Sequence, residues 1–323
     1  MPFKSLFLLA ALPVFAQSLS GAGISEASLE EQTKHLRALV ARSARLPLDL
    51  TEFAVHPPQP GWALEMVSSV ASDSKGVVYL LQRGEKADPV IAVDRDGRVL
   101  RSWGKGMFTI PHSIRVDPLG NIWTVDASAS KVFKFTPEGK LLLTIDVGGQ
   151  PANTKPGSFN GTTDIAFAPG GRIFIADGYG NARILEYGTD GKRVREWGRR
   201  GTGHGEFNLP HGIAVDERGT LYVADRENGR LQRFDLDGKY LSQINGLGKT
   251  FSMKIAGEFL YIGTQPRNEP NGAPGWLMKL DRQSGKVLGY VESTGHHSVE
   301  FTADGELMTG SRPDKVLWFR KPR

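Results

Sequence analysis

The sequence predicts an all-β fold, a six-bladed β-propeller, and three observations support this prediction. The chain has 323 residues, of which 39% are hydrophobic, so it is long enough to bury a large core. It contains 39 glycines, which is typical of a protein with many tight turns. Short alternating strands recur in groups of four, and the last turn of a group carries a glycine at position 97, 139, 191, 238 or 285. These glycines recur about every 40–50 residues, the period of a four-stranded propeller blade.

Residues 1–20 are predicted to form a secretory signal peptide. Lys4 gives the segment a positive start, an apolar run leads to Phe15, and Ala16 completes a small-residue cleavage pattern. The run is too short to cross a bilayer and Pro13 interrupts it, so we expect a secreted or periplasmic protein without stable membrane insertion. Because the chain has no cysteine, an exported fold would depend on its core, with or without a metal, and not on disulfides.

Residues 21–48 are predicted to be a leader or linker that is partly helical. Leu36, Leu39 and Val40 have the i, i+3, i+4 spacing of an amphipathic helix. Such a helix either docks a partner or acts as a spacer before the folded domain, and we favour the spacer. The propeller domain then covers residues 49–323. Lys and Arg are scattered among acidic residues, so the formal net charge of +5 does not indicate nucleic-acid binding.

Six units of the repeat are expected, starting near Val67, His112, Thr163, His211, Ser252 and His297. The last unit offers only three strands, at residues 298–302, 306–310 and 315–319. A blade with an open edge would invite aggregation. We therefore expect residues 49–55 to supply the missing strand and close the ring.

Three of the seven histidines share one register in alternate units. His112 and His211 each follow a proline at the start of a unit, and His297 opens the last unit. In all three the turn glycine comes eight residues later. The first strands of a propeller line its central channel, so these imidazoles are expected to converge there. A single histidine at a strand start is usually a packing or turn residue, but three in register predict a zinc site with an open fourth position. Register selects His297 as the third ligand, with the adjacent His296 as the alternative.

Three more polar residues are expected at the same rim, because each follows or ends the second strand of its unit. They are Arg83, Tyr179 and Arg226. Taken singly, Tyr179 and Arg226 would be packing or hydrogen-bonding residues, while Arg83 leaves a packing role and a functional role equally open. Around a metal their chemistry changes, since a metal and two guanidiniums would lower a tyrosine pKa from its usual ~10 and make a phenolate base available.

These residues carry a resemblance to a known family, over about residues 67–319. The most specific matching segments are Pro111-His112, Thr163-Asp164, Asp177-Gly178-Tyr179, Trp197-Gly198, Pro210-His211 and residues 224–230. Together they resemble the peptidyl-α-hydroxyglycine α-amidating lyases, which belong to the NHL-repeat β-propellers.

The resemblance implies an enzyme, a zinc-dependent carbon–nitrogen lyase. Zinc would be held by His112, His211 and His297, and Tyr179 would take the hydroxyl proton of a carbinolamide. Arg83 and Arg226 would orient the substrate and stabilise developing charge. The substrate would be a peptide or small molecule with a hydroxyglycine-like end, and the products would be an amide and glyoxylate.

The sequence departs from the family in one motif and leaves other functions open. Where the family has Met-Pro-His-Asp, this chain has Gly295-His296-His297-Ser298. Because Ser298 replaces the aspartate that helps to hold a structural calcium in the family, calcium is not expected. The main alternative is a non-catalytic NHL-repeat binding scaffold. A lactonase-like hydrolase is a third possibility, but it would need acidic calcium ligands at the channel, where this chain has histidines.

Overall fold

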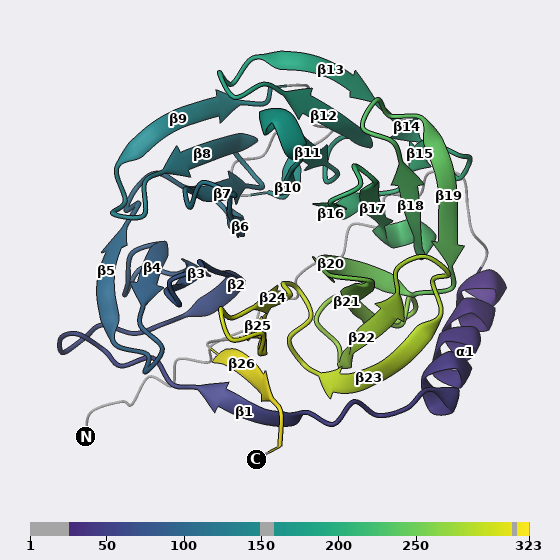
Figure 1. Ribbon diagram of the computed structural model, residues 1–323, viewed down its shortest axis with the longest axis horizontal. Helices are drawn as coiled ribbons and strands as arrows, with labels where there is room; N and C mark the ends of the chain where they lie inside the picture. Colours follow the sequence, from purple (N-terminus) through teal and green to yellow (C-terminus); the bar gives the residue numbers. More distant parts are fainter. Residues whose placement is uncertain (1–25, 149–157, 312–314, 323) are drawn as a thin grey trace, which may run out of the picture.

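Six four-stranded antiparallel sheets form a closed ring around a central channel (Figure 1). The structure is a computed structural model, and it describes residues 26–148, 158–311 and 315–322. The predicted all-β, six-bladed propeller is confirmed. The first strand of each blade lies next to the channel, and the last lies on the outer surface.

The first three blades each use four consecutive strands. Their strands are β2 (Met66–Ser72), β3 (Val78–Arg83), β4 (Val90–Val93) and β5 (Val99–Trp103); β6 (Pro111–Val116), β7 (Ile122–Asp126), β8 (Lys131–Phe135) and β9 (Leu141–Asp146); and β10 (Thr162–Phe167), β11 (Ile173–Asp177), β12 (Arg183–Tyr187) and β13 (Arg193–Trp197).

Blades four and five repeat this order. Their strands are β16 (Pro210–Val215), β17 (Leu221–Asp225), β18 (Arg230–Phe234) and β19 (Tyr240–Asn245); and β20 (Lys249–Ala256), β21 (Phe259–Gln265), β22 (Gly275–Asp281) and β23 (Val287–Ser293). The short parallel pair β14 (Arg199–Arg200) and β15 (Glu206–Phe207) joins blade three to blade four, and the 3-10 turns are η1 (Pro169–Gly171) and η2 (Arg226–Asn228).

The predicted closing strand is present in blade six. This blade contains β24 (Glu300–Phe301), β25 (Leu307–Ser311), β26 (Lys315–Arg320) and, from the other end of the chain, β1 (Asp49–Phe53). Strand β1 pairs antiparallel with β26 and covers the edge that the last three strands would otherwise leave open. Phe53 is buried, and its ring meets Trp318 edge-on at 5.1 Å between centroids.

The repeated glycine turns are required by packing between blades. Gly139 has φ +90°, and an added Cβ would lie 2.8 Å from the Trp103 ring on the outer strand of the preceding blade. Gly238 has φ +84°, with Trp197 of the preceding blade 3.0 Å from an added Cβ. Glycine meets both demands because it lacks a Cβ. Accordingly, each hydrophobic cluster of the core combines side chains from two neighbouring blades.

The helix α1 (Glu26–Arg42) is not a spacer, which corrects the sequence-based expectation. It lies against the outside of blades four and five (Figure 1), where Leu36 and Val40 are buried in one cluster with residues of both blades. The sequence shows the apolar stripe, but the surface that receives it exists only after blades four and five have formed. The predicted signal peptide, residues 1–20, lies outside the described residues. Among the helices that the structure describes, none has the length and apolar character needed to span a membrane.

Candidate metal centre

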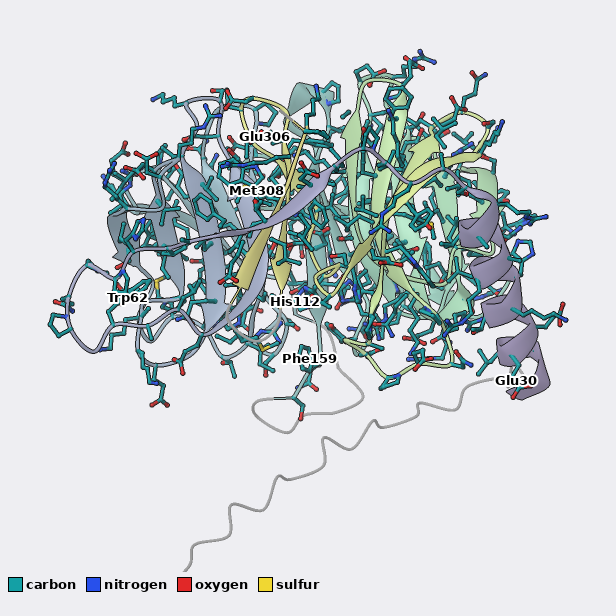
Figure 2. All side chains as sticks on the ribbon, turned by 90° about the horizontal axis from the view of Figure 1, so that it is seen from below. Glu30, Trp62, His112, Phe159, Glu306 and Met308 are labelled. Carbon is teal, nitrogen blue, oxygen red and sulfur yellow. The ribbon has the colours of Figure 1, made fainter. Side chains whose placement is uncertain are left out.

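The structure brings His112, His211 and His297 together in the channel. Their rings come from blades two, four and six, and the ring centroids lie 4.7 to 5.1 Å apart. One ring nitrogen from each lies within 4.8 Å of the others. Figure 2 places His112 near one end of the channel, on the side where Phe159 projects. Of the described residues, these three form the group of acidic or imidazole side chains that is close enough to hold a metal ion.

Irregular strand pairing directs the side chains of His112 and His211 into the channel. The register of β6 against β7 shifts between Pro111 and Ser113, so His112 is the extra residue of a β-bulge. The register of β16 against β17 shifts between Pro210 and Ile213 in the same way around His211. A bulge turns a side chain away from the regular alternation of the strand.

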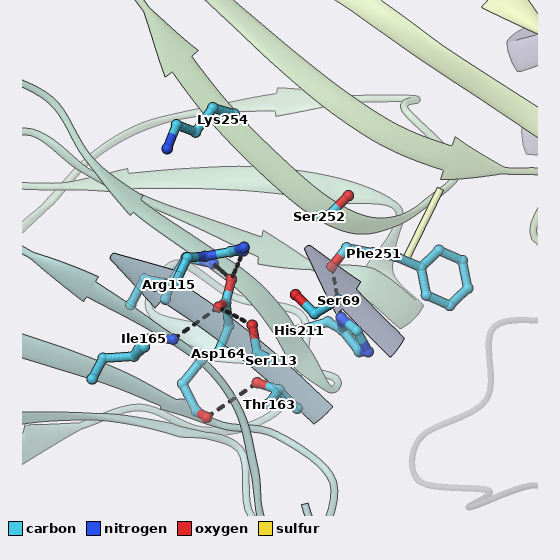
Figure 3. Close-up of polar contacts among 12 residues, drawn as sticks. Ser69, Ser113, Arg115, Thr163, Asp164, Ile165, His211, Phe251, Ser252 and Lys254 are labelled. Carbon is cyan, nitrogen blue, oxygen red and sulfur yellow. Dashed lines mark hydrogen bonds and ion pairs between the residues drawn. The ribbon is translucent and has the colours of Figure 1, made fainter. Parts of the chain in front are cut away.

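The neighbouring blades hold all three imidazoles by the same kind of hydrogen bond. Nδ1 of His112 lies 2.6 Å from the Thr163 carbonyl oxygen. Nδ1 of His211 lies 2.6 Å from the Phe251 carbonyl oxygen, a contact that Figure 3 shows. Nδ1 of His297 lies 2.8 Å from the carbonyl oxygen of Ser68. A carbonyl oxygen only accepts, so each Nδ1 carries the proton and each Nε2 presents its lone pair. This arrangement fixes the tautomer that a metal ligand needs.

The surroundings keep two of these imidazoles neutral. Burial lowers the pKa of His112 well below its usual value, and the electrostatic interactions with His211 and Arg83 lower it further. Burial and the nearby Arg226 lower the pKa of His211 in the same direction. A neutral imidazole is the form that binds metal. Three Nε2 atoms, each on an imidazole whose Nδ1 meets an uncharged carbonyl oxygen, are a donor set that fits zinc.

Tyr179 lies against two of the three histidines. Its hydroxyl is 2.9 Å from Nε2 of His112 and 3.0 Å from Nε2 of His211. The residue lies two positions after the end of β11, and its backbone N–H donates to the Gly161 carbonyl. Because both Nε2 atoms are acceptors in this tautomer, the phenol donates its single proton to one of them at a time.

Two guanidiniums lie near Tyr179: Arg226 faces its ring directly, and Arg83 lies over Phe159, which packs against Tyr179. Arg226 begins η2 and is buried, with its guanidinium 5.9 Å from the centroid of the Tyr179 ring and 5.0 Å from that of Phe251. Arg83 ends β3 and donates from Nε to the Pro111 carbonyl oxygen at 2.7 Å. The structure thus brings all six predicted site residues to one end of the channel.

His296 is separate from this group although it is adjacent in the sequence. Its Nε2 lies 2.9 Å from Oε1 of Gln265, and its ring packs 5.0 Å from that of Phe251. His297, and not His296, therefore belongs to the group. The next residue, Ser298, is buried, and its hydroxyl accepts a hydrogen bond from the Gly310 backbone N–H. A serine engaged in this way does not supply the carboxylate oxygen that calcium prefers.

The residues that hold the histidines, and one that packs against Tyr179, were not assigned these roles from the sequence. Ser68 and Thr163 precede Gly76 and Gly171 by the same eight residues that mark the histidines, so their register could have been noticed. Phe251 has no such spacing. Phe159 was also missed: it is 40% exposed, packs 4.8 Å from the Tyr179 ring, and lies under the Arg83 guanidinium at 5.2 Å.

A buried ion pair lies on the channel wall next to the histidines. Arg115 pairs with Asp164 at 2.7 Å, and Ser113 donates to the same carboxylate at 2.6 Å (Figure 3). The backbone N–H groups of Ile165 and Ile213 complete its hydrogen bonds. Asp164 follows Thr163, whose carbonyl holds His112, so this network fixes the strands that carry the site.

Comparisons with known proteins agree with this geometry. The family model described as "NHL repeat" matches residues 207–234. Peptidyl-alpha-hydroxyglycine alpha-amidating lyase 1 of Drosophila melanogaster is 32% identical, over 65% of this chain and 44% of that protein. Probable peptidyl-alpha-hydroxyglycine alpha-amidating lyase pgal-1 of Caenorhabditis elegans is 26% identical, over 72% of this chain and 69% of that protein.

Longer relatives and a solved structure complete the comparison. Peptidylglycine alpha-amidating monooxygenase of Rattus norvegicus is 29% identical over 78% of this chain, which spans only 30% of that protein. A streptogramin B lyase structure superposes with a TM-score of 0.58 over 85% of this chain and 98% of the other, at 17% identity, a likeness that shows the fold alone. From the sequence relatives and the repeat, this chain belongs to the peptidyl-α-hydroxyglycine α-amidating lyase family of NHL-repeat β-propellers.

Proposed function

We propose that this protein is a zinc-dependent lyase that cleaves the C–N bond of a carbinolamide, releasing an amide and glyoxylate. The substrate would be a peptide or small acyl compound with an α-hydroxyglycine-like end. The observation that supports this proposal is the Tyr179 hydroxyl within hydrogen-bond distance of two imidazoles whose carbonyl partners hold them in the tautomer that a metal ligand needs.

His112, His211 and His297 would hold the zinc through Nε2. When bound, zinc would supply Lewis-acid polarisation of the substrate's hydroxyl oxygen. Two of the ligand histidines have depressed pKa values, which favours metal binding at neutral pH.

Tyr179 would act as the base. Its phenolate oxygen takes the hydroxyl proton, the O–H electron pair forms the carbonyl of glyoxylate, and the C–N bond breaks. The leaving nitrogen is then protonated and becomes the amide. Arg226 and Arg83 would orient the substrate carboxylate and stabilise the charge that develops.

The test is glyoxylate release from an α-hydroxyglycine-extended peptide and from an N-acyl-α-hydroxyglycine. We expect release by the zinc-loaded protein and none above background after metal stripping. Tyr179→Phe should keep its zinc and lose about 10²–10⁴-fold in rate, since a general base is removed. Tyr240→Phe is the matched control, because Tyr240 lies in the outer strand β19 and stacks on His204, away from the three histidines. Its rate should equal that of the wild type.

A zinc-loaded wild type that releases no glyoxylate from several such substrates would overturn the lyase proposal. The non-catalytic binding scaffold would then take its place. We also propose that the protein is exported by its N-terminal signal peptide. Cell fractionation tests this, with recovery in the cytoplasm at full length as the contrary result.

A further inference from the structure

Helix α1 makes polar contacts with one loop of blade five, residues 266–274, which joins β21 to β22. Thr33 donates from its hydroxyl to Oδ1 of Asn268 at 3.0 Å, and Arg37 pairs with Glu269 at 3.2 Å. Nη1 of Arg267 donates to Oε1 of Gln32. Three successive loop residues thus each bind a side chain of the helix, more than 200 residues away in sequence.

Two of these three contacts involve a buried side chain, whereas the Arg37–Glu269 pair lies at the surface. Thr33 and Arg267 are 6% and 7% exposed, and buried polar groups are costly unless they are partnered. The same helix is anchored by Leu36, which is fully buried and packs where Gly248 leaves room for it. The helix therefore offers the loop a fixed support.

The inner side of the loop is held by a second set of hydrogen bonds. Gln265 is fully buried, and its amide donates to the carbonyl oxygen of Pro270 at 2.8 Å. Its Oε1 accepts from the Gly272 N–H at 3.0 Å and lies 2.9 Å from Nε2 of His296. Lys249 adds a bond from Nζ to the Glu269 carbonyl oxygen at 2.9 Å. The loop is therefore fixed between the helix on one side and His296 on the other.

The tip of this fixed loop forms part of the wall of the pocket at the histidines. Asn271 and Gly272 line one pocket together with Arg83, Phe251 and His297. Asn271 is exposed, and its Oδ1 accepts from Nζ of Lys249 at 3.3 Å. The hydrogen bond from Lys249 fixes the orientation of the Asn271 carboxamide, which suits hydrogen bonding to a peptide backbone. Figure 2 shows the Glu30 end of α1 toward the same face of the propeller as Phe159.

We propose that helix α1 and the loop 266–274 form one recognition unit for the amide portion of the substrate. Asn271 and Gly272 would contact the peptide or acyl segment that precedes the glycine-like end. Gln32, Thr33 and Arg37 are then positioning residues, because they hold this wall without touching the substrate. The chemical class of the substrate rests on the proposed function, whereas the support of the loop by the helix does not.

The test uses the double variant Thr33→Val/Arg37→Ala in the full, zinc-loaded chain. We expect faster hydrogen exchange in the peptide that covers residues 266–274, with unchanged zinc content. Affinity for a peptide ending in glycine, which lacks the reactive hydroxyl and serves as an inert probe, should fall about three- to tenfold, the usual effect of lost hydrogen bonds. In turnover, KM should rise by a similar factor with little change in kcat.

Two further variants make the result specific. Ser43→Ala alters the other end of α1, where the Ser43 hydroxyl donates to the Leu39 carbonyl, and should leave exchange and affinity unchanged. Asn271→Ala changes an exposed side chain at the loop tip, so the fold should be unaffected. We expect it to lower the affinity for the same peptide.

The outcomes separate this inference from the lyase proposal. Peptide affinity that is unchanged in both the double variant and Asn271→Ala would overturn the recognition unit, whatever the rate of glyoxylate release. Weaker peptide affinity in a protein that releases no glyoxylate would support the recognition unit and overturn the lyase.

Discussion

At the scale of single residues, the candidate metal centre depends on one strand position that recurs around the ring. In blades two and four this position holds a histidine on a bulge, and in blades one, three and five the corresponding bulge residue contributes its backbone carbonyl. These carbonyls belong to Ser68, Thr163 and Phe251, and each accepts a hydrogen bond from Nδ1 of the histidine in the preceding even-numbered blade. Because the acceptor is a backbone oxygen, side chains as different as serine and phenylalanine serve equally well.

Loss of one imidazole should abolish zinc binding. We expect about one zinc per chain in the wild type and almost none in His211→Ala, because two imidazoles rarely retain zinc against competition. Metal analysis after dialysis measures this. His204→Ala is the control, since His204 stacks on Tyr240 outside the group and its loss should leave zinc unchanged. Full zinc content in His211→Ala would contradict the ligand assignment.

Glu227 positions Arg226 at the site. Both Nε and Nη2 of Arg226 lie 2.8 Å from the same oxygen of Glu227. Burial raises the pKa of Glu227, but Arg226, Lys249 and Arg267 outweigh it and lower the pKa overall, so the carboxylate is charged. Glu227→Gln should keep zinc and reduce kcat/KM about 10- to 100-fold, the range for a charge-assisted hydrogen bond of about 1.5–3 kcal/mol.

The control for this variant is Glu196→Gln. Glu196 lies on the outer strand β13 and pairs with Arg183 and Arg193, away from the metal centre. We expect its kcat/KM to equal that of the wild type in the glyoxylate assay. Equal rates for the wild type and Glu227→Gln would show that Arg226 does not need this partner.

At the scale of elements, both N-terminal elements of the described chain stabilise blades that come later in the sequence. Strand β1 completes blade six, and α1 covers blades four and five. Each has one apolar face that is buried by distant residues: Phe53 meets Trp318, and Leu36 lies in the cluster with Met278. The packing of α1 and β1 therefore requires the completed ring. In turn, β1 covers the open edge of blade six, and α1 covers part of the outer surface of blades four and five.

The closing strand should contribute measurably to stability. Phe53→Ala removes a ring that is 5% exposed and should lower the free energy of unfolding by about 3 kcal/mol, as for other buried aromatic side chains. Leu50→Ala on the same strand is the control, because Leu50 is 52% exposed and should change stability by no more than about 0.5 kcal/mol. Urea unfolding compares the two, and equal midpoints would argue against a stabilising role for β1.

At the scale of the whole molecule, the ring is held at its centre by polar contacts between blades. The Asp164 carboxylate accepts from Arg115 of blade two and from the Ile213 backbone N–H of blade four, while it belongs to blade three. It therefore joins three blades directly next to the histidines. Burial of this network away from water makes its complete pairing a requirement for the fold.

Removal of this carboxylate should be strongly destabilising. Asp164→Ala leaves the buried Arg115 guanidinium without its partner and should cost about 3–5 kcal/mol. Asp304→Ala breaks the exposed pair with Arg95 and should cost no more than about 1 kcal/mol. Chemical denaturation of both variants measures the difference. Similar losses in the two would mean that the central network does not hold the blades together.

The sequence by itself determined the repeat, the number of blades and the register of the three histidines. Glycine turns and strand alternation are local properties, since a positive φ or a two-residue period is encoded by nearby residues. The pairing of β1 with β26 could also be predicted, because one blade lacked a strand and one spare segment remained. The positions of Arg83, Tyr179 and Arg226 followed from the same register.

Only the tertiary structure decided where α1 packs, which carbonyls hold the imidazoles and which loop forms the wall of the pocket. Leu36 has an apolar partner surface only after blades four and five have formed. Phe251 serves through its backbone oxygen, so its side chain gives no signal of that role. Thr33 and Asn268 are ordinary polar residues in the sequence, and they become a fixed pair because the closed ring brings them to 3.0 Å. Long-range contacts of this kind are set by the geometry of the ring and not by any local pattern of residues.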